Sequence, residues 1–169
     1  MANYEDAFQG GDLRSIGQSN QIAGHIHDQR SFDLLFDLLF HQERKVAMRA
    51  ADTIEKITIS NPEFLQQHKK KVLDLCNNAE RIEIKWHLAQ MVPRLVLTKN
   101  ERVRVWNVFF KWAKDKNESR IVRANALQGL HALVPYLEEN KQPFMQLVSS
   151  VYRENIPSVN ARIRKLKIT

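Results

Sequence analysis

The feature that most constrains this chain is a segment that occurs three times at a spacing of 38 residues. The copies are VAMRAADTIEKI at Val46–Ile57, IKWHLAQMVPRL at Ile84–Leu95 and VRANALQGLHAL at Val122–Leu133. Apolar residues keep the same four columns in every copy, 4, 4 and 3 residues apart. Because this spacing is that of the buried stripe of an amphipathic helix, each copy is predicted to form one helix with the same buried face.

Further apolar segments between the copies share the period. Leu34, Val72, Phe110 and Val148 follow one another at steps of 38 residues, so each unit is predicted to hold a second helix. Glycine and proline number only 5 each, and the turn signals of β-hairpins are absent. The predicted fold class is therefore all-α, an α-α superhelix of about five helical hairpins whose terminal members are imperfect.

Two of the copies carry a family resemblance. VRANALQGL and VAMRAADTI resemble the second helix of a HEAT repeat, in which a valine-arginine pair precedes small residues and a leucine. The resemblance covers about residues 12 to 169 and implies an ARM-type solenoid of the HEAT class. Only Val122-Arg123 keeps the pair, because Ala47 and Lys85 replace the arginine, and the aspartate that such repeats often carry in the turn forms no regular ladder.

The same pattern predicts one repeat domain over residues 1–169. Its units are a partial one at about 12–28 and full ones at 29–62, 63–98, 99–136 and 137–169. Residues 1–11 are expected to be loosely ordered, and the first helix to cover Leu13–Ile26. Pro93 removes the hydrogen bond to the carbonyl of Ala89, so a kink is expected there. Cys76 aligns with Leu38 and is interpreted as a core residue.

Charge is unevenly distributed along the chain. Residues 1–43 hold 2 bases against 7 acids, a net charge of −5, whereas residues 44–169 hold 24 bases against 12 acids, a net charge of +12. This asymmetry suggests an anionic partner, and it suits nucleic acid and acidic protein equally. The single cysteine, the absence of a signal peptide and the absence of a long apolar run predict a soluble, cytoplasmic protein without a membrane partner.

The resemblance implies that second helices line the concave surface, where a ligand would meet the residues that point away from the buried stripe. The aligned positions form three columns: Arg49, His87, Asn125 and Arg162; Asp52, Gln90, Gln128 and Lys165; and Lys56, Arg94 and Ala132. Trp86 is a candidate aromatic edge of this surface. The face is polar and moderately basic and could donate to phosphate or carboxylate, although solvated faces of amphipathic helices have the same composition.

Aromatic and histidine clusters are the remaining candidates for chemical sites. In WNVFFKW, Trp106, Phe109, Phe110 and Ala113 follow helical spacing, which favours core packing and leaves only Trp112 off the stripe. His25 and His27 would lie about 200° apart on a helix. No cysteine or carboxylate at ligand spacing completes that pair, so no metal site is predicted. Phosphate loops and nucleophile elbows are absent too, and no cofactor is predicted.

Three functional hypotheses follow. The first is a non-catalytic interaction scaffold that binds a protein or acidic peptide through the polar, basic groove. The alternative is nucleic-acid binding through the same surface. The third is an enzyme similar to HEAT-like DNA alkylation-repair glycosylases, for which Trp86, Trp112 and Asp115 are the only loose candidates and share no column.

Overall fold

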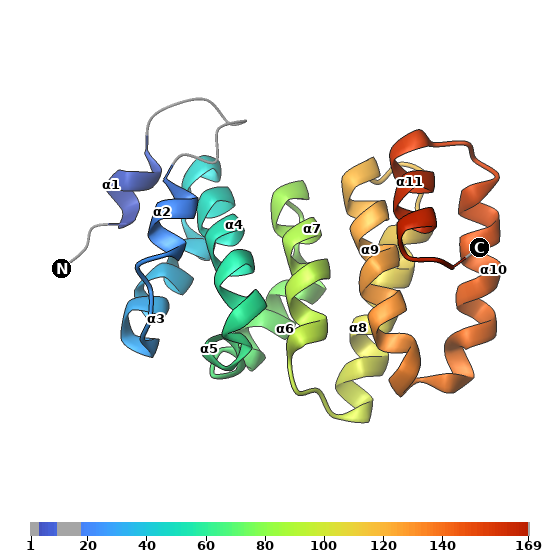
Figure 1. The fold of residues 1–169 in the computed structure, drawn as a ribbon, viewed down its shortest axis with the longest axis horizontal. Coiled ribbons are helices and arrows are strands. Elements are labelled where there is room, and N and C mark those ends of the chain that lie inside the picture. The colour runs from blue at the N-terminus through green and yellow to red at the C-terminus, as the bar shows by residue number, and fades with distance from the viewer. Residues whose placement is uncertain (1–3, 10–17, 169) are drawn as a thin grey trace. The chain divides into compact units, whose positions relative to one another are not determined.

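The computed structural model describes residues 4–9 and 18–168, and the regular elements of these residues are all α- or 3-10 helices (Figure 1). No β-strand occurs in this described part of the chain. The all-α prediction is therefore confirmed. The chain groups into two compact units, unit 1 with residues 1–69 and unit 2 with residues 70–169.

Unit 1 is organised around one long helix. Its elements are α1 (Tyr4–Phe8), α2 (Ser19–Ala23), α3 (Gln29–Asp37), η1 (Leu38–Phe40), α4 (Arg44–Ser60) and α5 (Pro62–Gln66). All the other elements contact α4, whose predicted stripe of Val46, Ala50, Ile54 and Ile57 is buried. Asp28 caps α3, because its carboxylate accepts from the backbone N–H and the hydroxyl of Ser31, which lowers the pKa of Asp28.

The N-terminal residues of unit 1 differ from the sequence-based expectation. The prediction that residues 1–11 are loosely ordered is wrong for residues 4–9, because α1 forms there and buries Phe8 completely. Residues 1–3, 10 and 11 lie outside the described residues. The helix expected over Leu13–Ile26 is observed only as α2, which ends at Ala23 before Gly24, while residues 13–17 also lie outside the described part. Burial of a large aromatic side chain provides the reason for α1 to dock.

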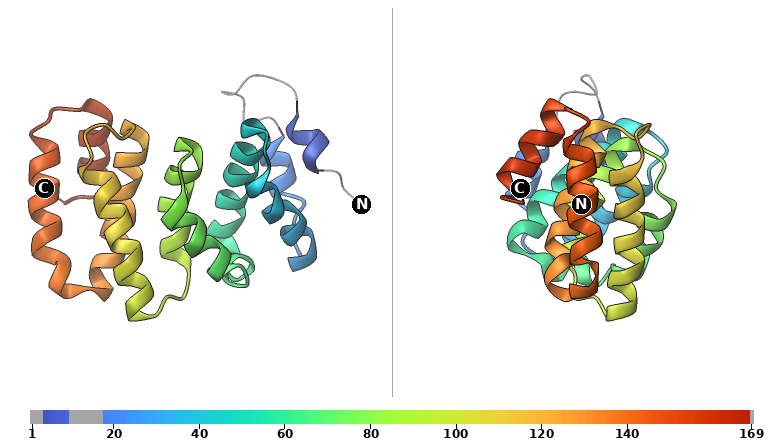
Figure 2. Two further views of the ribbon diagram at one scale, coloured as in Figure 1. Left: turned by 180° about the vertical axis from the view of Figure 1, so that it is seen from behind. Right: turned by 90° about the vertical axis from the view of Figure 1, so that its right-hand side faces the viewer.

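Unit 2 contains the remaining helices. They are α6 (Lys69–Asn78), which begins at the unit boundary, α7 (Ile82–Met91), η2 (Val92–Arg94), α8 (Lys99–Lys114), α9 (Arg120–Leu133), η3 (Val134–Tyr136), η4 (Glu138–Asn140), α10 (Lys141–Tyr152) and α11 (Pro157–Lys165). Helix α9 contacts α7, α8, α10 and α11. The second helices α7, α9 and α11 form one layer, and α8 and α10 lie in the other (Figures 1 and 2).

Pro93 ends a helix where a kink was expected. Helix α7 stops at Met91, and Val92–Arg94 forms a 3-10 turn, because proline offers no N–H to the carbonyl of Ala89. That carbonyl lies against Gly129 of α9: a Cβ on Gly129 would be 2.7 Å from the Ala89 oxygen and 2.7 Å from the Phe109 ring. Glycine at this position therefore permits the close approach of α7 and α9.

The core of unit 2 includes most of the aromatic cluster. Trp106, Phe109 and Ala113 are buried and Phe110 is half-buried, so the prediction of core packing is confirmed. Trp112, expected off the stripe, is instead only 7% exposed, with its ring centroid 5.5 Å from that of Phe109. Cys76 is buried as predicted, and desolvation raises the pKa of its thiol to about 12.

Candidate functional site

The first predicted column of binding residues is mostly inside the protein. Arg49, His87 and Asn125 are 1%, 1% and 2% exposed, so the prediction that they point away from the buried surface is wrong. The physical reason is clearest on α9, where contacts with α7 on one side and α11 on the other bury every residue from 122 to 127. A second helix flanked by neighbours buries more than one stripe.

Two of these buried polar side chains, Arg49 and Asn125, form hydrogen bonds within their own unit. The Arg49 guanidinium donates to the carbonyl of Phe8 at 2.5 Å, so it fixes the docked α1. The Asn125 side-chain amide donates to the Ile121 carbonyl at 2.8 Å, one turn back on α9. Arg49 and Asn125 therefore serve the interior of their units, where a buried polar group needs a hydrogen-bond partner.

In unit 1, the candidate that remains accessible is already paired. Lys56 is half-buried on α4, and its ammonium lies 2.6 Å from the carboxylate of Asp52 one turn earlier. The pair neutralises both side chains locally, so this part of the predicted surface presents little net charge.

In unit 2, the accessible candidates lie on α7, α9 and α11. Trp86, Gln90, Arg94, Gln128 and Arg162 are half-buried, and Lys165 is exposed. The partial burial of Trp86 fits a partly buried aromatic as well as an aromatic edge of the surface.

A direct contact joins two candidates from different helices. The Arg162 guanidinium on α11 donates to the side-chain oxygen of Gln128 on α9. Partial burial lowers the pKa of Arg162 from its ordinary value, a shift that leaves an arginine charged near neutral pH. This contact holds one cation in place while Lys165, one turn further on, extends into solvent. We call the surface formed by Gln128, Arg162 and Lys165 the α9–α11 face.

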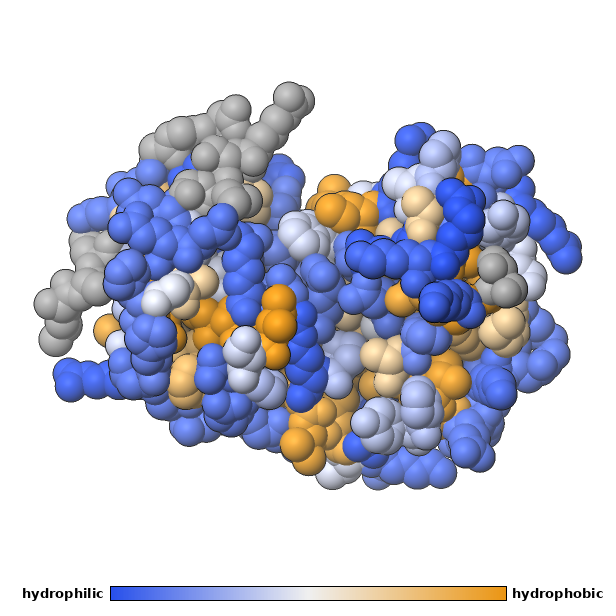
Figure 3. Space-filling model, in the orientation of Figure 1, coloured by the Kyte–Doolittle hydropathy of each residue, from blue (hydrophilic) through white to orange (hydrophobic). Residues whose placement is uncertain are grey.

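The end of unit 2 adds a cation that the column analysis missed. Arg164 is exposed on α11, and Lys167 follows the helix. Residues 155–168 contain four bases and no acid, a signal that was available in the sequence as a local excess of charge. In Figure 3, the side of unit 2 that presents α9 and α11 is mostly hydrophilic, with hydrophobic patches between the polar side chains.

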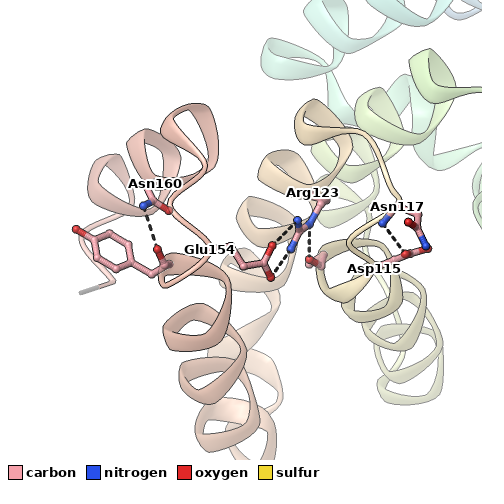
Figure 4. Close-up of polar contacts among 7 residues, drawn as sticks. Asp115, Asn117, Arg123, Glu154 and Asn160 are labelled. Atoms are coloured by element: carbon pink, nitrogen blue, oxygen red, sulfur yellow. Dashed lines mark hydrogen bonds and ion pairs between the residues drawn. The ribbon is translucent and has the colours of Figure 1, made fainter.

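Two further basic residues of unit 2 have a structural role. Arg123 is 2% exposed and donates to both carboxylate oxygens of Glu154, at 2.8 and 3.0 Å, and to the Ala113 carbonyl at 3.0 Å (Figure 4). These hydrogen bonds hold the pKa of Glu154 below its ordinary value. Lys85, 38 residues before Arg123, pairs with Glu118 at 2.5 Å.

The two pairs repeat from one hairpin to the next, as the turn aspartates of such repeats often do, and we call them the ladder of unit 2. In this chain the acid of each pair is a glutamate. In each pair a base on a second helix reaches the acid in the turn of the following hairpin, before α9 for Glu118 and before α11 for Glu154. Glutamate supplies the carboxylate that aspartate often supplies in such repeats. The signal that could have found it is the alignment of Lys85 with Arg123, together with a glutamate 33 or 31 residues later.

The residues of the glycosylase hypothesis do not form a surface cluster. Trp112 is buried against Phe109, and Asp115 is exposed beyond the end of α8, with its carboxylate accepting from the backbone N–H of Asn117 at 2.9 Å (Figure 4). One of the three residues is thus inaccessible to a ligand. Among the described residues, no group of three or more His, Cys, Asp or Glu side chains could hold a metal ion.

Stacked helical hairpins with a polar outer surface define the class of α-helical repeat proteins. A family model described as HEAT repeat domain matches residues 9–167, and the chain therefore belongs to the HEAT-repeat family. Searches of curated proteins and of solved structures found no match. Members of this family are generally non-enzymatic scaffolds for interactions. None of the helices in the described residues is long and apolar enough to cross a membrane.

Proposed function

We propose that the protein is a non-catalytic scaffold that binds an acidic segment of a partner protein through the α9–α11 face of unit 2. The observation that carries this proposal is the pairing of Arg162 with Gln128, which fixes a guanidinium at the junction of two helices. An immobilised guanidinium loses less side-chain entropy on binding a carboxylate than a freely rotating one, so its contribution to affinity is greater.

The surroundings of Arg162 support an anionic ligand. Lys165 and Arg164 are exposed on the same helix, and the nearest acid in sequence, Glu154, is occupied by Arg123. A carboxylate that approaches α11 therefore meets cations without a competing acid on that helix. The polar side chains of Gln90 and Gln128 add neutral hydrogen-bond donors on the second helices.

Direct binding measurements with matched variants test this proposal. A fluorescently labelled peptide of glutamate and serine is titrated with the protein, and the same peptide with glutamine for glutamate serves as the uncharged probe. The double variant Arg162→Gln/Lys165→Gln is expected to weaken binding of the acidic peptide about five- to tenfold, because two charged contacts are lost.

The control removes the same charge elsewhere. Arg104→Gln/Lys111→Gln also replaces one arginine and one lysine, both exposed on α8, and should leave the peptide affinity within about twofold. Equal weakening by the two double variants, or equal binding of the charged and uncharged peptides, would overturn the proposal. Thermal unfolding of each variant checks that glutamine at position 162 has not unfolded the protein.

Nucleic-acid binding through the α9–α11 face is the alternative, and the same variants decide it. If Arg162→Gln/Lys165→Gln weakens binding of a DNA duplex and leaves the peptide affinity unchanged, the face is a phosphate site rather than a peptide site.

A further inference from the structure

The cations of unit 2 fall into two groups. Those in the first group have partners within the unit: Lys85 with Glu118, Arg123 with Glu154, Lys99 with Glu139, Arg102 with the Tyr136 ring, and Arg162 with Gln128. The side chains of the second group make no hydrogen bond or ion pair within the described residues. They include Arg120, Lys141, Arg153, Arg164 and Lys165, and three of them, Arg104, Lys111 and Lys114, are exposed together on the single helix α8.

These three cations of α8 share one face of that helix with two asparagines. We call Asn100, Arg104, Asn107, Lys111 and Lys114 the α8 outer stripe; all five are exposed. At 3.6 residues per turn they fall within about 80° of the helix circumference, and Arg104 and Lys114 are about 15 Å apart along its axis. Helix α8 lies in the layer opposite α9 and α11, as the rear view in Figure 2 shows, so this stripe is separate from the α9–α11 face.

The acids nearest to the stripe in sequence are engaged. Glu101 accepts from the backbone N–H of Thr98 at 2.7 Å in the capping box that starts α8. Asp115 accepts from the backbone N–H of Asn117 at 2.9 Å in the turn that follows the helix. The adjacent helix α10 has no acid between Lys141 and Arg153. The positive potential of the stripe is therefore weakly opposed by its neighbours.

We propose that the α8 outer stripe is a second binding surface, which contacts the phosphate backbone of a nucleic acid. Contacts to phosphate need only cations and amide donors at intervals, and these are the side chains present. The stripe carries no large apolar or aromatic side chain, and contacts to phosphate need none. Its length of about 15 Å equals the axial rise of about four base pairs, at about 3.4 Å each.

This surface binds without reading sequence. Exposed lysine and arginine side chains reach phosphates along the strand, whereas discrimination between bases requires an element inserted in a groove. Affinity is therefore expected to be similar for unrelated duplexes and to fall steeply with salt, since each neutralised phosphate contributes about 0.9 to the slope of log K against log salt.

A salt titration with the full-length protein tests the proposal. Binding of a labelled DNA duplex of arbitrary sequence is measured by fluorescence anisotropy at several sodium chloride concentrations. The variant Arg104→Gln/Lys111→Gln is expected to bind about tenfold more weakly at low salt and to lower the slope by about 1.8, because two phosphate contacts are lost.

The matched control is Lys70→Gln/Arg120→Gln, which removes equal charge from exposed positions of unit 2 outside both surfaces and should leave the DNA slope unchanged. Absence of DNA binding by the wild-type protein at low salt would overturn the proposal. So would equal loss of slope in both double variants, which would indicate a response to net charge alone. Because the peptide and the duplex are assayed separately, this proposal can fail while the scaffold proposal stands, and the reverse.

Discussion

At the scale of single residues, Gly129 determines how closely α7 and α9 can pack. The change Gly129→Ala places a Cβ 2.7 Å from the backbone oxygen of Ala89, which cannot move without shifting α7. We expect this variant to lose about 1–3 kcal/mol of unfolding free energy, as overpacked cores do, although alanine favours helix by about 1 kcal/mol. Urea unfolding measures the difference. A variant as stable as the wild type or more stable would contradict the close approach.

A control for Gly129 lies three residues further along the same helix. Ala132 is exposed on α9, so Ala132→Gly changes only the intrinsic helix propensity. Ala132→Gly should lower the unfolding free energy by about 1 kcal/mol. Helix propensity alone would make Gly129→Ala raise it by a similar amount. The pair of variants separates packing from propensity.

Glu154 gives the ladder of unit 2 a pH dependence. The pKa of Glu154 is lowered from the ordinary value of 4.5, chiefly by the hydrogen bonds from Arg123. The pair therefore stabilises the folded state fully at pH values above 4.5. This stabilisation is lost as the pH falls through the lower pKa of the folded state. The variant Glu154→Gln should lose about 1–3 kcal/mol at pH 7 because it leaves the buried Arg123 guanidinium without a carboxylate. Urea unfolding at pH 7 and pH 3 measures both effects.

The sign of the pH effect makes this test specific. Wild-type stability should fall more than that of Glu154→Gln between pH 7 and pH 3, since only the wild type loses the ion pair. Parallel pH profiles for the two proteins would mean that the Arg123–Glu154 pair contributes nothing to stability.

At the scale of elements, docking of α1 depends on Phe8. This side chain is completely buried in unit 1, and its carbonyl accepts from Arg49 on α4. We expect Phe8→Ala to release α1, because the lost burial of an aromatic ring costs about 3–5 kcal/mol. Amide hydrogen exchange should then become fast at residues 8 and 9, whose N–H groups a helix at residues 4–8 can protect, and remain slow in the core of α9.

The control for α1 is the same substitution at Phe40, which is 50% exposed in the same unit. Phe40→Ala should leave exchange at residues 8 and 9 unchanged. Unchanged protection in Phe8→Ala would show that α1 is held by polar contacts such as Arg49 and the Glu5–His41 pair at 3.3 Å.

Most of the helical architecture could be predicted from the 38-residue period, because a stripe at steps of 4, 4 and 3 residues defines one buried face. Val46, Ala50, Ile54 and Ile57 are all buried accordingly. Arg49 and Asn125 were misplaced because a single helix pattern contains no information on the neighbours that cover its flanks. Helix α1 was missed because five residues are too short to show a period.

The candidate surface was predictable only in part. Lys165, Arg162 and Gln128 are accessible in unit 2, whereas the hydrogen bond between Arg162 and Gln128 depends on the packing of α11 against α9, which no column alignment specifies. The α8 outer stripe lies on a first helix, whereas the repeat pattern predicts a binding surface on the second helices only. Its signal in the sequence was the set of bases at positions 104, 111 and 114.

At the scale of the whole molecule, the two units have opposite charge. Unit 1 holds 7 bases against 10 acids, a net charge of −3, and unit 2 holds 19 bases against 9 acids, a net charge of +10. An anionic partner is therefore expected to associate with unit 2, at a rate that falls as salt rises. Both proposed surfaces lie within that unit.

The most direct test of the central claim is to follow the backbone amide resonances of the protein by NMR while the glutamate and serine peptide is added. Chemical-shift changes are expected to cluster on α9 and α11, around Gln128, Arg162 and Lys165, and to leave the α8 outer stripe unaffected. Shifts centred on Arg104 and Lys111, or spread evenly over both layers of unit 2, would contradict the assignment of the acidic partner to the α9–α11 face.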